Sequence, residues 1–275
     1  MHLPSLMFWP LLAGLVLAGM HTWLGLQLVE RRVVFAGLSF PQLAALGAAL
    51  AFLKGHDVPS TAAYLWSVGF TLLGAAILTF IHEHPRTGIS QESLIAMVYA
   101  SSAGIAITVV SRMPQNTEHL EDMLVGNILS VGAAPVIGTA VLYALLALLY
   151  FVFRRKFVTA SEAVQTPAGK IWDFLFYASF GVVVTLSVNL AGLLLVFAYL
   201  VFPAVAAMLF TRSTAKRLAI GWMTGALATA AGVLLSIEAD IPTSAAIVSS
   251  FAGLLLLLAL GRLGITRSTR QAHPR

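Results

Sequence analysis

The chain has 275 residues, of which 59% are hydrophobic and only 10% are charged. Soluble globular domains carry about 45–50% apolar and about 25% charged residues, so this composition excludes an ordinary water-soluble enzyme. The absence of cysteine excludes disulfides, thiolate metal sites and cysteine nucleophiles. The net charge of +5 at pH 7 fits the excess of Lys and Arg in the cytoplasmic loops of membrane proteins, and we expect no nucleic-acid partner.

Apolar stretches follow one another along the whole chain. They cover residues 4–29, 33–53, 61–81, 92–111, 133–153, 171–190, 191–210, 218–237 and 242–261. Each is close to the length of about 20 apolar residues that a helix needs to cross a bilayer. The sixth and seventh stretches are almost continuous, so eight spans is the alternative to nine. We therefore predict an all-α, polytopic membrane protein.

The domain organisation follows from the same pattern. One transmembrane domain is predicted over residues 1–262, followed by a basic, polar tail over residues 263–275. We expect that tail to be unstructured or to lie on anionic membrane lipid, which attracts basic segments.

The distribution of basic residues predicts the orientation. With nine spans, 13 of the 16 Lys and Arg residues lie at the end of the bundle where the odd-numbered spans finish, two lie at the other end, and Lys170 is ambiguous. Cytoplasmic loops carry the excess of Lys and Arg. The bias predicts that the N-terminus lies outside the cell and the C-terminus inside.

A few polar residues interrupt the apolar spans. Gln42 lies in the middle of the second span, beside Ser39 and Pro41, and Glu92 opens the fourth span. A proline inside a helix frees a backbone carbonyl, which is tolerated at membrane depth only beside protein or a water-filled cavity. Ser39, Gln42 and Glu92 therefore either line a translocation path or belong to a packing kink with a hydrogen-bonded glutamine.

Histidine and acidic residues outside the spans form candidate accessory metal sites. His82 and His84 flank one glutamate at the end of the third span, but their i, i+2 spacing does not match the i, i+4 pair of a metalloprotease helix. His119 and Asp122 lie on an amphipathic segment that we interpret as an external interfacial helix, and Asp240 lies in a loop on the same side. Each is either a metal ligand or part of a solvated surface.

The region after the seventh span is a candidate docking segment for a soluble partner. Pro203 lies near the end of that span, and Arg212, Lys216 and Arg217 follow it on the predicted cytoplasmic side. The alternative is plain anchoring by positive charge. The chain contains none of the Walker A, G-x-S-x-G and H-E-x-x-H motifs, so we expect it to be no enzyme itself and to bind no cofactor.

Several segments together resemble the permeases of metal-ion ABC transporters of the zinc, manganese and iron uptake type. Residues 30–47 resemble the second span of those permeases, and residues 91–95 the acidic opening of the fourth. Residues 119–129 are similar to their leucine–glycine motif, residues 191–212 to their seventh span and the segment after it, and residues 240–242 to an acidic–proline feature before the last span.

The resemblance implies a permease subunit of an ATP-driven importer in a bacterial inner (plasma) membrane, with a divalent metal, zinc or manganese first, as cargo. Its expected partners are a second copy of the chain, separate ATP-binding subunits, and a periplasmic or lipid-anchored metal-binding protein. The segment from Pro203 to Arg217 would meet the ATPase. From the residues themselves, a stand-alone secondary transporter or channel remains the alternative.

The chain departs from that family at one position of the second span. Family members commonly carry a histidine where this chain has Gln42, and an acid near Leu38. An amide oxygen is a weaker, neutral ligand for Zn²⁺ or Mn²⁺ than imidazole or carboxylate. The resemblance then implies either that the cargo passes with fewer protein ligands or that it is not a bare divalent metal.

Overall fold

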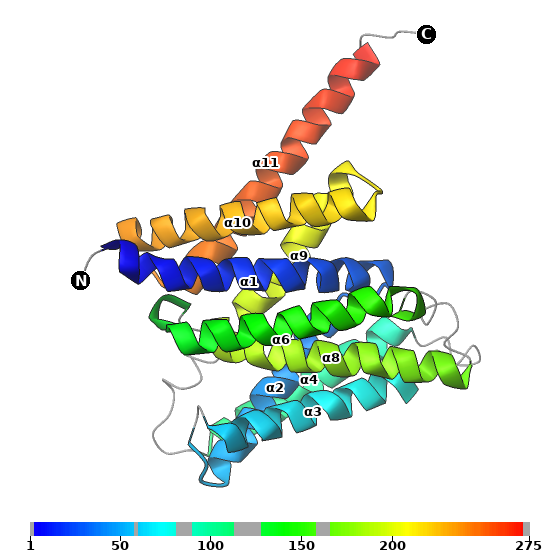
Figure 1. The fold of residues 1–275 in the computed structure, drawn as a ribbon, viewed down its shortest axis with the longest axis vertical. Coiled ribbons are helices and arrows are strands. Elements are labelled where there is room, and N and C mark those ends of the chain that lie inside the picture. The colour runs from blue at the N-terminus through cyan, green and yellow to red at the C-terminus, as the bar shows by residue number, and fades with distance from the viewer. Residues whose placement is uncertain (1–2, 58–59, 81–89, 113–127, 158–165, 272–275) are drawn as a thin grey trace.

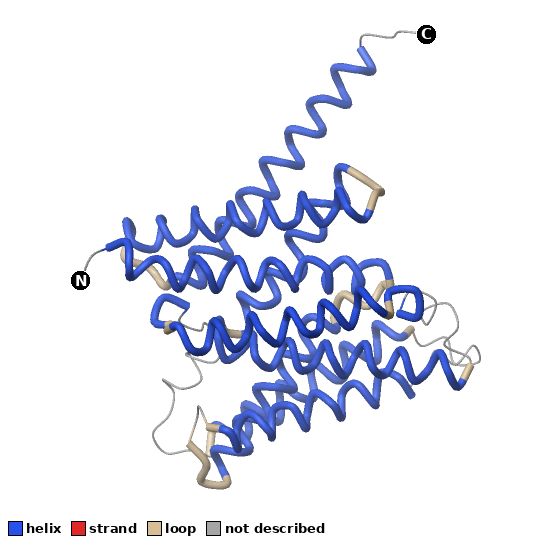
Figure 2. Tube along the Cα trace, viewed as in Figure 1, coloured by secondary structure: helices blue, strands red, loops and turns tan. Residues whose placement is uncertain are grey.

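The computed structural model describes residues 3–57, 60–80, 90–112, 128–157 and 166–271. These residues form helices joined by short connections, without a strand among them (Figure 2). The helices are α1 (Leu3–Glu30), α2 (Ala36–Leu53), α3 (Thr61–Phe80), α4 (Gln91–Val110), the short 3₁₀ helix η1 (Ile128–Ser130), α6 (Ala133–Val152), α8 (Pro167–Ala191), α9 (Leu193–Phe210), α10 (Thr214–Ala239) and α11 (Thr243–Gln271).

Nine of these helices, all except η1, are long and apolar enough to cross a membrane within the described part of the chain. The all-α, polytopic prediction is confirmed, with nine spans rather than eight. The sixth and seventh stretches are separate helices because Gly192, with φ of 82°, interrupts the helical conformation between α8 and α9. Residues with a side chain rarely adopt such a conformation, whereas glycine does so at little cost.

The helices lie side by side in one bundle (Figure 1), in which most residues of α2 are buried. α2 packs against α3, α4 and α8, whereas α1 packs against α9 and α10. α11 leaves the bundle obliquely and stays helical as far as Gln271. α11 therefore continues through residues 263–271 of the predicted tail, and the location of that tail on a lipid surface stays a prediction.

An aromatic cluster joins α2 to α8 in the core. The Phe40 ring lies 4.9 Å from the ring of Phe180 in an edge-to-face arrangement and 6.1 Å from that of Tyr177. Phe176 contacts the Tyr177 ring in turn, at 5.3 Å. All four side chains are buried, and such pairs add about 0.5–1.5 kcal/mol each beyond their burial. This cluster fixes α2 within the bundle.

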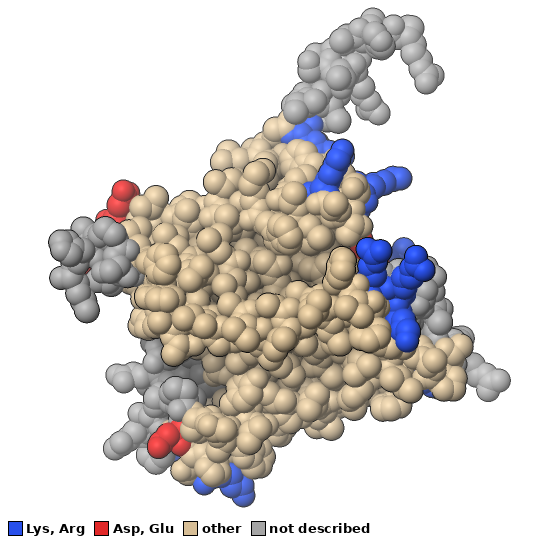
Figure 3. All heavy atoms as spheres, in the orientation of Figure 1, with Lys and Arg blue, Asp and Glu red and all other residues tan. Residues whose placement is uncertain are grey.

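Charged side chains gather at the ends of the bundle. Most Lys and Arg side chains visible in Figure 3 lie at one end, and a wide band free of charged side chains separates them from the other end. The basic end is the one where α1 finishes and α2 begins. This is the pattern from which the orientation was predicted, and the orientation itself stays a prediction.

Helices α1 and α9 approach each other at Gly25. A Cβ atom added to Gly25 would lie 1.8 Å from the carbonyl oxygen of Leu200 in α9, whereas one added to Gly19 would meet nothing within 4 Å. Small residues allow such close approach in membranes, where apolar bulk alone does not drive helices together. The contact between α1 and α9 therefore depends on the absence of a side chain at Gly25.

We predict that Gly25→Ala destabilises the protein by about 1–3 kcal/mol, the usual effect of overpacking. The reason is that the new methyl group would force α1 away from α9. The measurement is thermal unfolding of the detergent-solubilised protein, with Gly19→Ala as the matched control in the same helix. Equal melting temperatures for the two variants would contradict the close contact.

Candidate functional site

Two of the predicted path residues, Ser39 and Glu92, lie where the first turns of α2 and α4 pack together. The Glu92 carboxylate accepts a hydrogen bond of 2.9 Å from the backbone N–H of Phe35. The Ser39 hydroxyl donates to the carbonyl oxygen of Ile95 at 2.9 Å. A carboxylate beside the first N–H groups of a helix satisfies a free donor and complements the helix dipole. Both residues therefore hold α4 against the start of α2.

Gln42 lies one turn further along α2, and its amide makes no hydrogen bond with the part of the chain that the structure describes. It is 8% exposed. Leu38 and Phe35, four and seven positions earlier on the same side of α2, are partly exposed and exposed. Because an amide without a partner is costly in hydrocarbon, Gln42 requires water, a solute, another polypeptide or a residue outside the described ranges at its exposed edge.

The turn between α9 and α10 presents its basic residues in two different ways. Arg212 and Lys216 are exposed. Arg217 instead turns back: its Nε–H donates to the carbonyl oxygen of Thr211 at 2.9 Å, and its Nη1–H to the carboxylate of Glu30 at 2.7 Å. Pro203 is buried inside α9. The part of the predicted docking segment that a soluble protein could contact is therefore the turn with Arg212 and Lys216.

An ion pair between Arg31 and Asp173 lies buried at the same end of the bundle. The two side chains are 5% and 3% exposed, with 2.5 Å between Nη1 of Arg31 and Oδ1 of Asp173. Arg31 also donates to the carbonyl oxygen of Phe157 at 3.0 Å, and its guanidinium lies 3.9 Å from the ring centroid of Phe176. Removing one partner of a buried pair leaves an uncompensated charge, which costs about 3–5 kcal/mol.

Sequence reasoning missed this pair. It counted Arg31 among the basic residues that set the orientation and gave Asp173 no role. The available signal was that each is a charge close to the end of a long apolar stretch, on the same predicted side of the membrane. That signal indicates proximity to one surface but not which charges meet.

A buried polar network joins α1, α6 and α8 deep in the bundle. The Nδ1 atom of His21 lies 2.9 Å from the carbonyl oxygen of Leu17, and Nε2 lies 3.0 Å from the hydroxyl of Ser187. Since a carbonyl only accepts, Nδ1 carries the proton, and Nε2 is in contact with the Ser187 hydroxyl, which also lies 2.6 Å from the carbonyl oxygen of Val183. Ser187 is in turn 2.5 Å from the hydroxyl of Tyr143. Both ring nitrogens are engaged, so His21 is not available as a metal ligand.

Most of the candidate accessory metal ligands lie outside the described residues, namely His82, His84, His119 and Asp122. Asp240 is described: it ends α10 in the left-handed conformation, with φ of 51°, and is exposed. Within the described ranges, no group of three or more His, Asp or Glu side chains could hold a metal ion. Asp240 therefore forms no metal centre with the described residues.

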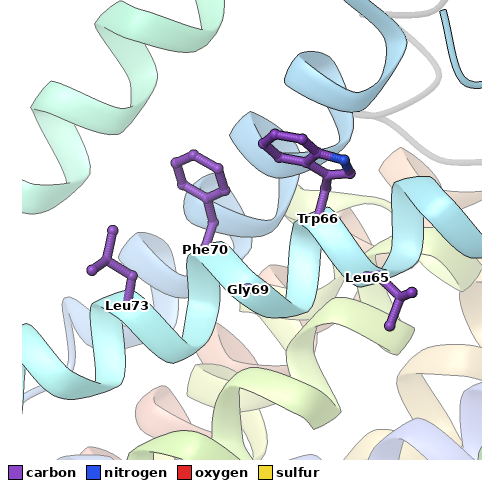
Figure 4. Close-up of a pocket in the computed structure, with 5 residues that line it drawn as sticks. All are labelled: Leu65, Trp66, Gly69, Phe70 and Leu73. Atoms are coloured by element: carbon purple, nitrogen blue, oxygen red, sulfur yellow. The ribbon is translucent and has the colours of Figure 1, made fainter. Parts of the chain in front are cut away.

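A shallow hollow of about 490 Å³ lies along α3 and is lined by apolar side chains (Figure 4). Trp66, Phe70 and Leu73 project from the same side of the helix, whereas Leu65 points away from them. These side chains offer no oxygen or charged group to a cation. The hollow is thus unsuited to an ion site and fits the hydrocarbon surroundings of a membrane helix.

Comparison with known proteins places this bundle among transport permeases. The chain matches the ABC 3 transport family over residues 4–262. It is 26% identical to a probable iron transport system membrane protein of Haemophilus influenzae, over 86% of this chain and 87% of that protein. It is 25% identical to the high-affinity zinc uptake system membrane protein ZnuB of the same organism, over 92% and 96%.

Other similarities agree with that assignment. The chain is 24% identical to the manganese transport system membrane protein MntC of Listeria innocua, over 74% of this chain and 71% of that protein. The solved structure of PsaBC from Streptococcus pneumoniae in complex with Fab shares the fold, with a TM-score of 0.75, 22% identity, and coverage of 92% of this chain and 90% of that one. The chain is a multi-pass inner-membrane protein and belongs to the ABC 3 transport family.

Proposed function

We propose that the chain is the membrane-spanning permease subunit of an ATP-driven importer for a divalent metal ion, zinc or manganese. The observation that carries the proposal is the family match over residues 4–262, which includes all nine apolar helices of the described structure. The names of the similar proteins agree on metal transport and differ in the metal, which supports the class of cargo. ATP hydrolysis belongs to a separate subunit, because the chain has no Walker A motif.

The alternative is a secondary transporter or channel that works without an ATPase. Ion-coupled transporters use ionisable side chains within the membrane. The acidic residues in the nine described spans are Glu30, Glu92, Asp173 and Glu238, and each lies within two turns of a helix end. This placement favours a permease that takes its energy from another subunit.

In the proposed mechanism, two copies of the chain form a path that opens alternately to each side of the membrane. A periplasmic or lipid-anchored binding protein delivers the metal, and ATP-binding subunits drive the change from the cytoplasmic side. Gln42 is the path residue that the geometry supports best, because its amide is nearly buried and lacks a partner in the described structure. Ser39 and Glu92 shape that path by holding α4 against the start of α2.

We predict that Gln42→Leu lowers metal uptake by cells about tenfold, which corresponds to one lost hydrogen bond to the passing ion or its water. The measurement is uptake of radioactive zinc and of manganese in cells that lack their own importers. Gln27→Leu, which changes a half-buried glutamine of α1, is the matched control. If the two variants transport equally well, Gln42 does not line the path.

We predict that the double variant Arg212→Glu/Lys216→Glu loses co-purification with the ATPase subunit, because both side chains are exposed on the turn that would dock there. The control is Lys54→Glu/Arg112→Glu, the same charge change on two exposed residues at the opposite end of the bundle. Retention of the ATPase by the first variant, at the level of the control, would refute the docking assignment.

A further inference from the structure

Glu30, the last residue of α1, and Arg31, the next residue, form ion pairs with different helices at the basic end of the bundle. Glu30 pairs with Arg217 at the start of α10, at 2.7 Å. Arg31, the next residue, pairs with Asp173 of α8. Two neighbouring positions of the chain thus connect helices that lie 187 and 142 residues further along the sequence.

On the α10 side of Glu30, Arg217 stabilises the turn between α9 and α10. Its backbone N–H donates to the carbonyl oxygen of Ser213 at 2.8 Å, and its side chain donates to that of Thr211. The same guanidinium holds Glu30, and the Arg217 side chain is only 13% exposed. A displacement of the turn therefore acts directly on the end of α1.

On the other side, most backbone N–H groups of the connection from α1 to α2 are hydrogen-bonded. The backbone N–H of Val33 donates to Leu28 O at 2.9 Å, and that of Arg32 donates to Val29 O at 3.1 Å, with Arg32 in the left-handed conformation at φ of 59°. This is the pattern that closes a helix end tightly. The N–H of Ala36 then donates to Val33 O at 3.0 Å.

The start of α2 and the end of α1 are each bonded to a neighbouring helix. Phe35 is fastened to α4 through Glu92. On the α1 side, Arg31 forms its buried ion pair with Asp173 of α8. Glu30 is thus joined to α2, the helix that carries Gln42, by a short and hydrogen-bonded connection.

We propose that Glu30 is a positioning residue that transmits movement of the α9–α10 turn to α2, through its ion pair with Arg217. The proposal rests on the proposed function, since it gives the ATPase-facing turn a mechanical connection to the metal path. Glu30 touches neither the ATPase nor the metal in this account. We expect ATP hydrolysis to continue without this ion pair, but to drive less metal transport.

The test uses the assembled transporter of permease, ATPase and binding protein in proteoliposomes, with ATP hydrolysis and zinc and manganese uptake measured on the same sample. For Glu30→Gln we expect normal co-purification and ATP hydrolysis within about twofold of the wild type, but about tenfold less uptake, as for the loss of a typical coupling between two sites. Glu30→Arg is expected to be as defective, and Glu30→Arg/Arg217→Glu to regain at least half of wild-type uptake. Glu238→Gln, an exposed glutamate at the far end of α10, is the control.

The ratio of metal transported to ATP hydrolysed separates this role from a structural one. A purely structural or docking role would lower assembly, hydrolysis and uptake together, and would overturn the proposal. So would wild-type uptake in Glu30→Gln, or a charge-swapped variant no better than Glu30→Arg. A wild-type complex that hydrolyses ATP without moving either metal would overturn the proposed function itself, and the inference with it.

Discussion

The hydrocarbon core offers no water to polar groups, and the described structure follows from this constraint. Hydroxyl groups inside the spans turn back to the carbonyl one turn earlier, as Thr79 does to Ala75 at 2.8 Å and Ser102 to Val98 at 2.7 Å. His21 is enclosed in a network in which both ring nitrogens are used. The Gln42 amide makes no hydrogen bond within the described part of the chain, and among the fully buried atoms there the Thr22 hydroxyl also lacks a partner.

The same constraint concentrates the chemistry of the chain at the ends of its helices. Both ion pairs of the described residues, Arg31 with Asp173 and Arg217 with Glu30, lie at the basic end. Glu92 caps α2 at this end as well. The turn that would meet an ATPase, the junction between α1 and α2, and the first turn of α4 therefore form one connected region. A permease without its own energy source needs such a region, because work done by a partner must enter through it.

The nine spans could be predicted from the sequence within a few residues, because about 20 consecutive apolar residues leave few alternatives to a membrane helix. The separation of α8 from α9 was predicted with a single continuous span as the alternative, because it depends on the conformation of Gly192. The ion pairs were out of reach for another reason. Charge near a helix end is visible in the sequence, but the pairing of Arg31 with Asp173 depends on which helices become neighbours in space.

The candidate path residues show the same division. Polarity inside an apolar span drew attention to Ser39, Gln42 and Glu92, but only the packing separates them. Ser39 and Glu92 form hydrogen bonds between α2 and α4, whereas the Gln42 amide forms none in the described part of the chain. Likewise, Arg212 and Arg217 are five positions apart in one basic stretch, yet one is exposed and the other braces the turn. Such distinctions arise from tertiary contacts, which a single sequence does not encode in any local pattern.

The most direct test of the account is zinc and manganese uptake by sealed proteoliposomes that contain the purified chain, with and without the ATPase subunit and binding protein. The account predicts that metal accumulates only when all components and hydrolysable ATP are present, and that a non-hydrolysable ATP analogue abolishes accumulation. Metal entry driven by the chain alone, without nucleotide, would contradict it.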